Sequence, residues 1–131
     1  MALPIYSVDS SALIHGWRRA YRPRNFGLVW ARIDGLINEG RLRASIEVYR
    51  EMERKDDELF AWCKERRAAM FEGRSGGDPF VIALAATARP PMTVITEESP
   101  GRQRIPDVCA GEGIPYIGLA DLIEQENWQF G

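Results

Sequence analysis

The stretch Ile5-Tyr6-Ser7-Val8-Asp9-Ser10-Ser11 places an acid and two hydroxyls directly after four residues of strand-forming character. The helix-like residues Ala12-Leu13-Ile14 follow, so this segment predicts a strand, a turn and a helix. In open α/β sheets ligands bind at the carboxyl edge of the strands, which is where Asp9 is expected. The simpler interpretation is that Asp9 or Ser10 caps the next helix. Three further acids that the same edge can gather favour a functional role.

Helices and strands alternate along the rest of the chain. The β-branched run 92–96 predicts a strand, and 114–117 predicts another. Apolar spacing predicts helices at about 26–38, 46–52, 58–71, 78–86 and 119–126, with Asn25 as the cap of the first, Ser45 of the second and Asp56 or Asp57 of the third. This pattern predicts an α/β fold, a three-layer α/β/α sandwich with a mostly parallel central sheet. The first strand and the 93–95 strand are expected at its centre.

The length and composition of the chain limit the class of protein to which it can belong. The 131 residues fit one domain, 1–131, and 45% hydrophobic with 27% charged residues is typical of a soluble globular protein. No apolar run approaches the ~20 residues that span a bilayer, so we expect no membrane partner and a cytoplasmic location. Cys63 and Cys109 have no metal-ligand spacing. Because His15 is the only histidine, a Ser-His-Asp triad or a multi-histidine metal site is disfavoured, and carboxylates must carry any catalysis.

Four carboxylates are predicted to converge at the carboxyl edge of the sheet. They are Asp9 after the first strand, Glu51 on a helix, Asp78 at a helix start, and Glu97 or Glu98 after a later strand. Carboxylates without histidine or cysteine suit hard cations such as Mg²⁺ or Mn²⁺, which activate water and stabilise charge on a phosphodiester. Without a metal, packed acids repel one another, and their pKa values rise. As alternatives, Glu51 is an ordinary surface glutamate and Asp78 is a helix cap.

The segment 17–24 interleaves Trp17 and Tyr21 with four arginines, which are Arg18, Arg19, Arg22 and Arg24. Pro23 discourages a continuous helix, so the segment is predicted to be an exposed loop. Arginines and aromatics together bind single-stranded nucleic acid by phosphate pairing and base stacking. A solvated loop held by its two aromatic residues fits the composition equally well. Arg102 and Arg104, in a later polar loop, are further candidates for RNA contact.

Taken in order, four stretches resemble the PIN domain, the nuclease fold of the VapC-like toxins of prokaryotic toxin–antitoxin pairs. They are the strand with Asp-Ser at 6–11, the valine-x-x-glutamate helix at 48–52, the Asp-led helix at 78–85, and the strand ending in Thr-x-acid at 94–98. The tail 104–109, followed by Gly113-Ile114, resembles the uncharacterised PIN-like branch known as DUF4411. The pieces cover nearly the whole chain, and their order and spacing carry the resemblance.

This resemblance implies a metal-dependent endoribonuclease that acts as a toxin. Its implied partners are RNA, an antitoxin protein and, since PIN toxins commonly dimerise, a second copy of the chain. Carried over by position, the catalytic and metal-binding acids are Asp9, Glu51, Asp78 and Glu98. Thr96 supports the fourth acid, and Ser10 orients Asp9 or a metal-bound water. Glu97 is the alternative fourth acid if the turn is shifted by one residue.

The chain departs from the PIN pattern in two places. Its last acid is glutamate where aspartate is commoner, and the connection from Glu51 to Asp78 is short, with 73–77 standing where more helix is usual. These departures keep a second hypothesis open, a catalytically weak or inactive PIN-like binding module. A phosphatase of the haloacid dehalogenase kind is disfavoured, because it needs a second aspartate where this chain has Ser11.

Overall fold

The computed structural model of the chain describes residues 3–71, 92–98, 109, 111 and 113–130. The first half contains β1 (Tyr6–Val8), α1 (Ser10–His15), the π-helical turn η1 (Gly16–Ala20), α2 (Gly27–Asn38), β2 (Leu42–Arg43), α3 (Ile46–Lys55), α4 (Glu58–Glu65) and α5 (Arg67–Met70). The second half contains β3 (Thr93–Ile95), β4 (Tyr116–Ile117) and α8 (Leu119–Gln125). The predicted alternation of strands and helices is confirmed.

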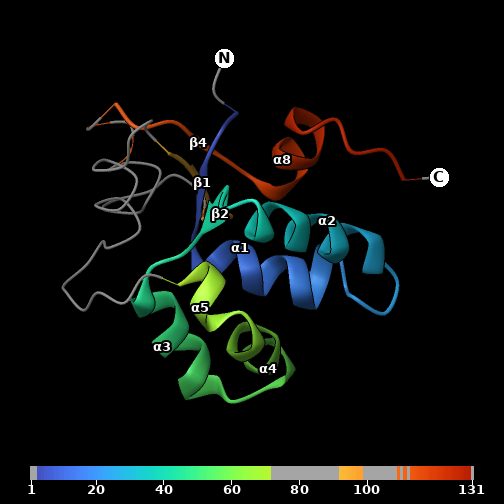
Figure 1. The fold of residues 1–131 in the computed structure, drawn as a ribbon, viewed down its shortest axis with the longest axis vertical. Helices are drawn as coiled ribbons and strands as arrows, with labels where there is room; N and C mark the ends of the chain where they lie inside the picture. The colour runs from blue at the N-terminus through green and yellow to red at the C-terminus, as the bar shows by residue number, and fades with distance from the viewer. Residues whose placement is uncertain (1–2, 72–91, 99–108, 110, 112, 131) are drawn as a thin grey trace.

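The described strands form one parallel sheet in the order β2-β1-β3-β4. Tyr6 of β1 lies opposite Leu42 of β2, Val8 of β1 opposite Ile95 of β3, and β3 pairs in turn with β4. Figure 1 shows α1, α2 and α8 to one side of this sheet and α3, α4 and α5 beyond the end of β1. The prediction of a parallel α/β sheet centred on the first strand and the 93–95 strand is therefore confirmed.

The two central strands are covered on both faces. No residue of β1 is more than 2% exposed, and Val94 and Ile95 of β3 are fully buried. Side chains alternate between the two faces of a strand, so continuous burial means that chain packs against both sides, as parallel sheets require. The helix expected at 78–86, which begins with Asp78, lies outside the described residues.

Two helical segments differ from their predictions. Residues 16–20 are not a loop: the helix continues from α1 as a π-turn, in which the N–H of Tyr21 donates to the carbonyl of Gly16 at 2.9 Å. The helix expected over 58–71 is two helices that break at Arg66. There the N–H of Arg66 bonds the carbonyl of Cys63, and its guanidinium bonds Asp34 of α2 and the carbonyl of Trp62. Tertiary contacts of a long side chain thus interrupt a segment that is helical by pattern.

The predicted caps Ser45 and Asp57 are confirmed, whereas Asn25 does not cap α2, whose N-cap position is held by Phe26 without a capping side-chain bond. The hydroxyl of Ser45 accepts the N–H of Val48 at 3.4 Å, and the carboxylate of Asp57 accepts the N–H of Phe60 at 3.1 Å. These bonds satisfy amides that a helix start leaves free, so they fix where α3 and α4 begin. None of the helices described here combines the length and the apolarity needed to cross a bilayer.

Candidate functional site

Asp9 stands at the carboxyl end of β1, between the sheet and α1. Its backbone continues the sheet, because its N–H donates to the carbonyl of Ile95 at 2.8 Å. Its own carbonyl accepts the N–H groups of Ala12 and Leu13, so Asp9 occupies the N-cap position of α1. Its side chain makes no capping bond, however. The simple cap interpretation therefore does not account for the carboxylate, which is turned elsewhere.

Two hydroxyls hold the Asp9 carboxylate. Ser11 Oγ donates to Asp9 Oδ2 at 2.6 Å, and Thr96 Oγ1 donates to the same oxygen at 3.0 Å. The hydroxyls of Ser11 and Thr96 are themselves 3.1 Å apart. The N–H groups of Glu97 and Glu98 donate to Ser11 Oγ and Thr96 Oγ1, respectively. The turn after β3 is thus tied to the turn after β1 through hydroxyls that converge on one carboxylate oxygen.

The electrostatics of this cluster disfavour negative charge on Asp9. Burial raises the pKa of Asp9, the hydrogen bonds from Ser11 and Thr96 lower it in part, and the negative charge of Glu98 raises it again. Asp9 is only 6% exposed, and no basic side chain in the described ranges forms an ion pair with it. Cys109, fully buried nearby, has a raised thiol pKa because of burial and the charge of Asp9.

Glu97 and Glu98 interact with different groups. Glu97 Oε2 accepts the N–H of Leu119 at 2.7 Å, which places this carboxylate at the start of α8. Its other oxygen lies 3.7 Å from Nε2 of His15. A Cβ at Gly118 would come within 2.7 Å of Glu97 Oε2, so the close approach depends on that glycine. Glu97 therefore binds a helix terminus, whereas Glu98 acts electrostatically on Asp9.

The remaining acids of the predicted site are not brought together within the described residues. Glu51 lies on α3, which packs against α1, and is half-buried without a bond to Asp9. Asp78 lies outside the described residues. Among the residues that are described, no three His, Cys, Asp or Glu side chains are grouped closely enough to hold a metal ion.

Ser11 is a site residue that the sequence prediction missed. The prediction gave the orienting hydroxyl to Ser10, but the hydroxyl on Asp9 belongs to Ser11, and Ser10 contributes its backbone N–H. Position alone offered a signal. Short polar side chains such as Ser and Asp commonly form local hydrogen bonds between positions two residues apart where a strand ends and a helix begins.

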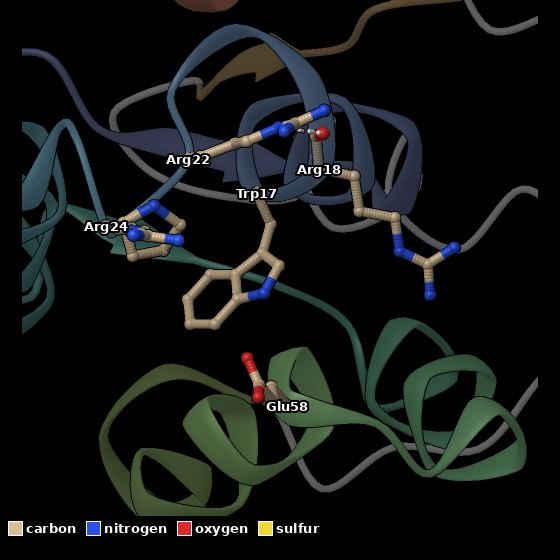
Figure 2. A pocket seen from close by; sticks show the side chains of 6 residues that line it. Trp17, Arg18, Arg22, Arg24 and Glu58 are labelled. Atoms are coloured by element: carbon tan, nitrogen blue, oxygen red, sulfur yellow. Dashed lines mark hydrogen bonds between the residues drawn. The ribbon is translucent and has the colours of Figure 1, made fainter.

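A second polar region lies between η1 and α4. It is a hollow of about 280 Å³ whose walls are Trp17, Arg18, Arg22, Pro23, Arg24 and Glu58, and Figure 2 shows it from close by. Arg18 forms an ion pair with Asp57, the cap of α4. Arg19 is exposed on η1 but does not line this hollow, and Arg102 and Arg104 lie outside the described residues. The structure therefore places three of the six predicted RNA-contacting arginines together.

A family model described as a domain of unknown function, DUF4411, matches the chain in two segments, residues 6–77 and 69–130. Together the segments extend over nearly the whole sequence, and they overlap at 69–77. The match is thus broken in the region of Gly73–Gly77. A search of curated proteins and a search of solved structures each returned no significant match.

Proposed function

The chain belongs to the DUF4411 family of domains of unknown function, and we propose that it is a metal-dependent endoribonuclease that hydrolyses RNA phosphodiester bonds at the Asp9 edge of the sheet. We further propose that it is the toxin of a toxin–antitoxin pair. The PIN-like order of motifs supports both proposals. The observation that carries the first is the buried Asp9 carboxylate, held by two hydroxyls at the carboxyl edge of a central strand.

The charge of this cluster suits a divalent cation. Burial and the negative charge of Glu98 both raise the pKa of Asp9, so a bound cation would relieve an unfavourable arrangement. Oxygen ligands of this kind fit Mg²⁺ or Mn²⁺. Asp9 and Glu98 would hold the ion, together with Glu51 and Asp78 as the PIN resemblance implies. When bound, such an ion lowers the pKa of a water and offsets charge that builds on the phosphate.

The chain itself supplies a fixed carboxylate. Ser11 and Thr96 both bond Oδ2, which fixes the orientation of the Asp9 carboxylate before any ligand arrives. Fixed ligands matter because a metal site tolerates little displacement. Glu98 is favoured over Glu97 as the fourth acid, because the Glu97 carboxylate already accepts the amide of Leu119. In the proposed reaction, arginines of the 17–24 segment, or Arg102 and Arg104, hold the RNA backbone by bidentate phosphate contacts.

The test is cleavage of a pool of structured and unstructured RNA in Mn²⁺, in Mg²⁺ and in EDTA. We expect cleavage by the wild type with either metal and none in EDTA. Asp9→Asn should lower the rate at least about a hundredfold with an unchanged far-UV circular dichroism spectrum. The matched control is Asp121→Asn, which makes the same chemical change at an exposed position of α8. An Asp9→Asn protein that cleaves as fast as the wild type would refute the assignment.

The toxin role has its own test. Induced expression of the active chain in a bacterial host should arrest growth, and expression of Asp9→Asn at the same level should not. Growth arrest by both variants would contradict a toxic role that depends on cleavage.

A PIN-like binding module with a degraded site is the second candidate. The observation that favours it is the break in the family match at 69–77, close to the predicted position of Asp78. A folded protein that cleaves no RNA in any metal condition, and that binds a protein partner tightly, would favour this candidate over the nuclease.

A further inference from the structure

The hollow between η1 and α4 has the size and the lining of a ligand site. Its volume of about 280 Å³ is close to the ~300 Å³ at which small-molecule sites begin. It combines one large aromatic side chain, three guanidinium groups, a proline and one carboxylate. Such a mixture of an apolar surface with a few charged groups is what ligand recognition requires.

Trp17 gives this hollow a rigid aromatic surface. Its ring centroid lies 5.0 Å from that of Trp30 in an edge-to-face contact, and 6.1 Å from that of Trp62. The indole N–H of Trp30 donates to the carbonyl of Tyr21 at 2.6 Å, which anchors the supporting ring. Because these rings hold the indole of Trp17 in one place, stacking on it costs little ordering entropy. A nucleobase gains about 1–3 kcal/mol from such stacking.

Figure 2 shows Arg18, Arg22 and Arg24 around Trp17, with the guanidinium group of Arg22 directed to the backbone carbonyl of Arg18. Arg22 uses Nε to bond the carbonyl of Arg18 at 2.8 Å, and in the described part of the chain its two terminal nitrogens bind nothing. Arg24 is exposed and forms no ion pair with any described residue. Arg18 is held in place by Asp57. The rim is thus prepared for the phosphates of a ligand.

Glu58 is the one acid of the hollow, and it lies across from Trp17 in Figure 2. It is the first residue of α4 and is exposed, and among the residues described its carboxylate makes no hydrogen bond or ion pair. Three arginines line the same hollow, yet none of them binds it. Two acceptor oxygens are therefore available beside a stacking surface.

We propose that this hollow binds an unpaired guanine nucleotide of single-stranded RNA, with the base on Trp17, its Watson–Crick edge on Glu58 and its phosphates on Arg22 and Arg24. The proposal rests on the proposed function, because it names the substrate feature that the nuclease recognises. Guanine presents two adjacent donors, N1–H and the N2 amino group, and a carboxylate accepts both at once. Unpaired bases are commonly recognised in this way, by stacking and by their Watson–Crick edges.

The other three bases fit the carboxylate less well. Adenine and cytosine each place a ring-nitrogen acceptor beside their amino group, and that acceptor would face a Glu58 oxygen. Uracil has a single N–H between two carbonyls. A carboxylate at this position therefore selects guanine by repelling its competitors as well as by binding it.

The hollow is also placed to position RNA for the Asp9 site. Trp17 follows Asp9 by eight residues along one helical segment, which is roughly 12 Å at the rise of an α-helix. A base that is bound at Trp17 would hold the strand near the carboxyl edge of the sheet. The hollow would then determine where along an RNA the cut falls.

The experiment measures binding separately from cleavage. Fluorescein-labelled U-rich RNA heptamers with G, A, C or U at the centre are titrated with the full chain in EDTA, and anisotropy gives each Kd. We expect the G heptamer to bind about tenfold more tightly than the A heptamer, the effect of one good bidentate contact. Since EDTA removes the metal, the result is the same whether or not the Asp9 site cleaves RNA.

Two variants of exposed residues identify the contacts. Glu58→Gln should weaken binding of the G heptamer about tenfold and strengthen binding of the A heptamer, because the amide offers a donor to the adenine ring nitrogen that the carboxylate repels. The double variant Arg22→Ala with Arg24→Ala should weaken all four heptamers equally, and should reduce the slope of log K against log salt by about 0.7 for each phosphate that is no longer neutralised. Glu124→Gln on α8 and Arg54→Ala on α3, both exposed and outside the hollow, are the matched controls.

Three outcomes would overturn the proposal. They are equal affinity for all four heptamers, a guanine preference that Glu58→Gln leaves intact, and no detectable binding of any heptamer. If guanine-selective binding is found but the wild type cleaves no RNA with Mg²⁺ or Mn²⁺, the proposed function fails and the binding proposal stands.

Discussion

β1 carries a buried polar cluster at each of its ends, and the two clusters differ in how their charge is balanced. At the amino end, Tyr6 donates its hydroxyl hydrogen to Glu126 at 2.5 Å and accepts a hydrogen bond from Gln125 at 2.8 Å. Arg41 forms an ion pair with the same Glu126 at 2.5 Å and also bonds the carbonyl of Pro4. Burial and the bond to Glu126 raise the pKa of Tyr6, which stays neutral. Each group in this cluster has a complementary partner.

At the carboxyl end, Asp9 has hydroxyls but no counter-ion among the described residues. Ser11 and Thr96 donate hydrogen bonds to it, while Glu98 repels it. A buried charge that has hydrogen bonds but no opposite charge is costly for the fold. The comparison indicates that charge is balanced within the Arg41–Glu126 cluster and is left unbalanced at Asp9, which is the feature on which the proposed metal site rests.

The largest effect on stability is expected at the balanced end. Arg41→Met should lower the free energy of unfolding by about 3 kcal/mol, because it leaves Glu126 partly buried without its counter-ion. Urea denaturation followed by circular dichroism measures this difference. Arg50→Met is the control, since the exposed pair of Arg50 with Glu47 should contribute less than about 1 kcal/mol. An equal loss in the two variants would show that burial of the Arg41 pair adds nothing.

Thr96→Val removes one hydroxyl from the Asp9 carboxylate while keeping the β-branched shape. We expect a loss of about 1 kcal/mol in the free energy of unfolding, since the N–H of Glu98 and Oδ2 of Asp9 each lose a bond. If Asp9 is catalytic, metal-dependent cleavage should also fall about tenfold, because the carboxylate is held less firmly. Thr93→Val, at the start of the same strand, is the control. Unchanged cleavage in Thr96→Val would separate the hydroxyl from catalysis.

Substitutions of the neighbouring acids Glu97 and Glu98 should have different effects, one on stability and the other on RNA cleavage. Glu97→Gln should cost about 0.5–1 kcal/mol of stability, because a neutral amide stabilises the start of α8 less than a carboxylate does. It should leave the rate of cleavage per folded molecule unchanged. Glu98→Gln should instead lower cleavage with little loss of stability. The reverse pattern, in thermal melts and RNA cleavage assays, would make Glu97 the fourth acid.

The smallest effect concerns pH. The pKa of Asp9 is raised in the folded state above its ordinary value of 3.8, so the charged form disfavours folding once the pH rises through that range. Asp9→Asn should therefore be slightly more stable than the wild type at pH 7 in EDTA, and this advantage should vanish below about pH 4. Thermal melts of both proteins at several pH values measure it. A wild type that is the more stable protein at pH 7 would mean that the carboxylate has a favourable partner.

The local sequence pattern was sufficient to predict most helices and strands and the two strands at the centre of the sheet. The strands at 6–8 and 93–95, the caps Ser45 and Asp57, and the helix that ends at Asn38 follow from apolar spacing, β-branched residues and capping side chains. Each of these signals acts within a few residues of the chain. The break at Arg66 and the π-turn after α1 were not predicted, because they depend on contacts with other helices.

The candidate site divides in the same way. The sequence by itself determined that an acid follows the first strand, that a hydroxyl and two acids follow the strand at 93–95, and that arginines and aromatics alternate at 17–24. Only the tertiary structure decided that Ser11 and Thr96 share one oxygen of Asp9, that Glu97 turns to α8 while Glu98 acts on Asp9, and that Glu58 joins Trp17 across a hollow. The physical reason is the distance along the chain over which each signal acts. Strand, helix and cap signals act over a few neighbouring residues, whereas the direction of a charged side chain depends on which distant groups the packed sheet and helices bring within hydrogen-bonding distance.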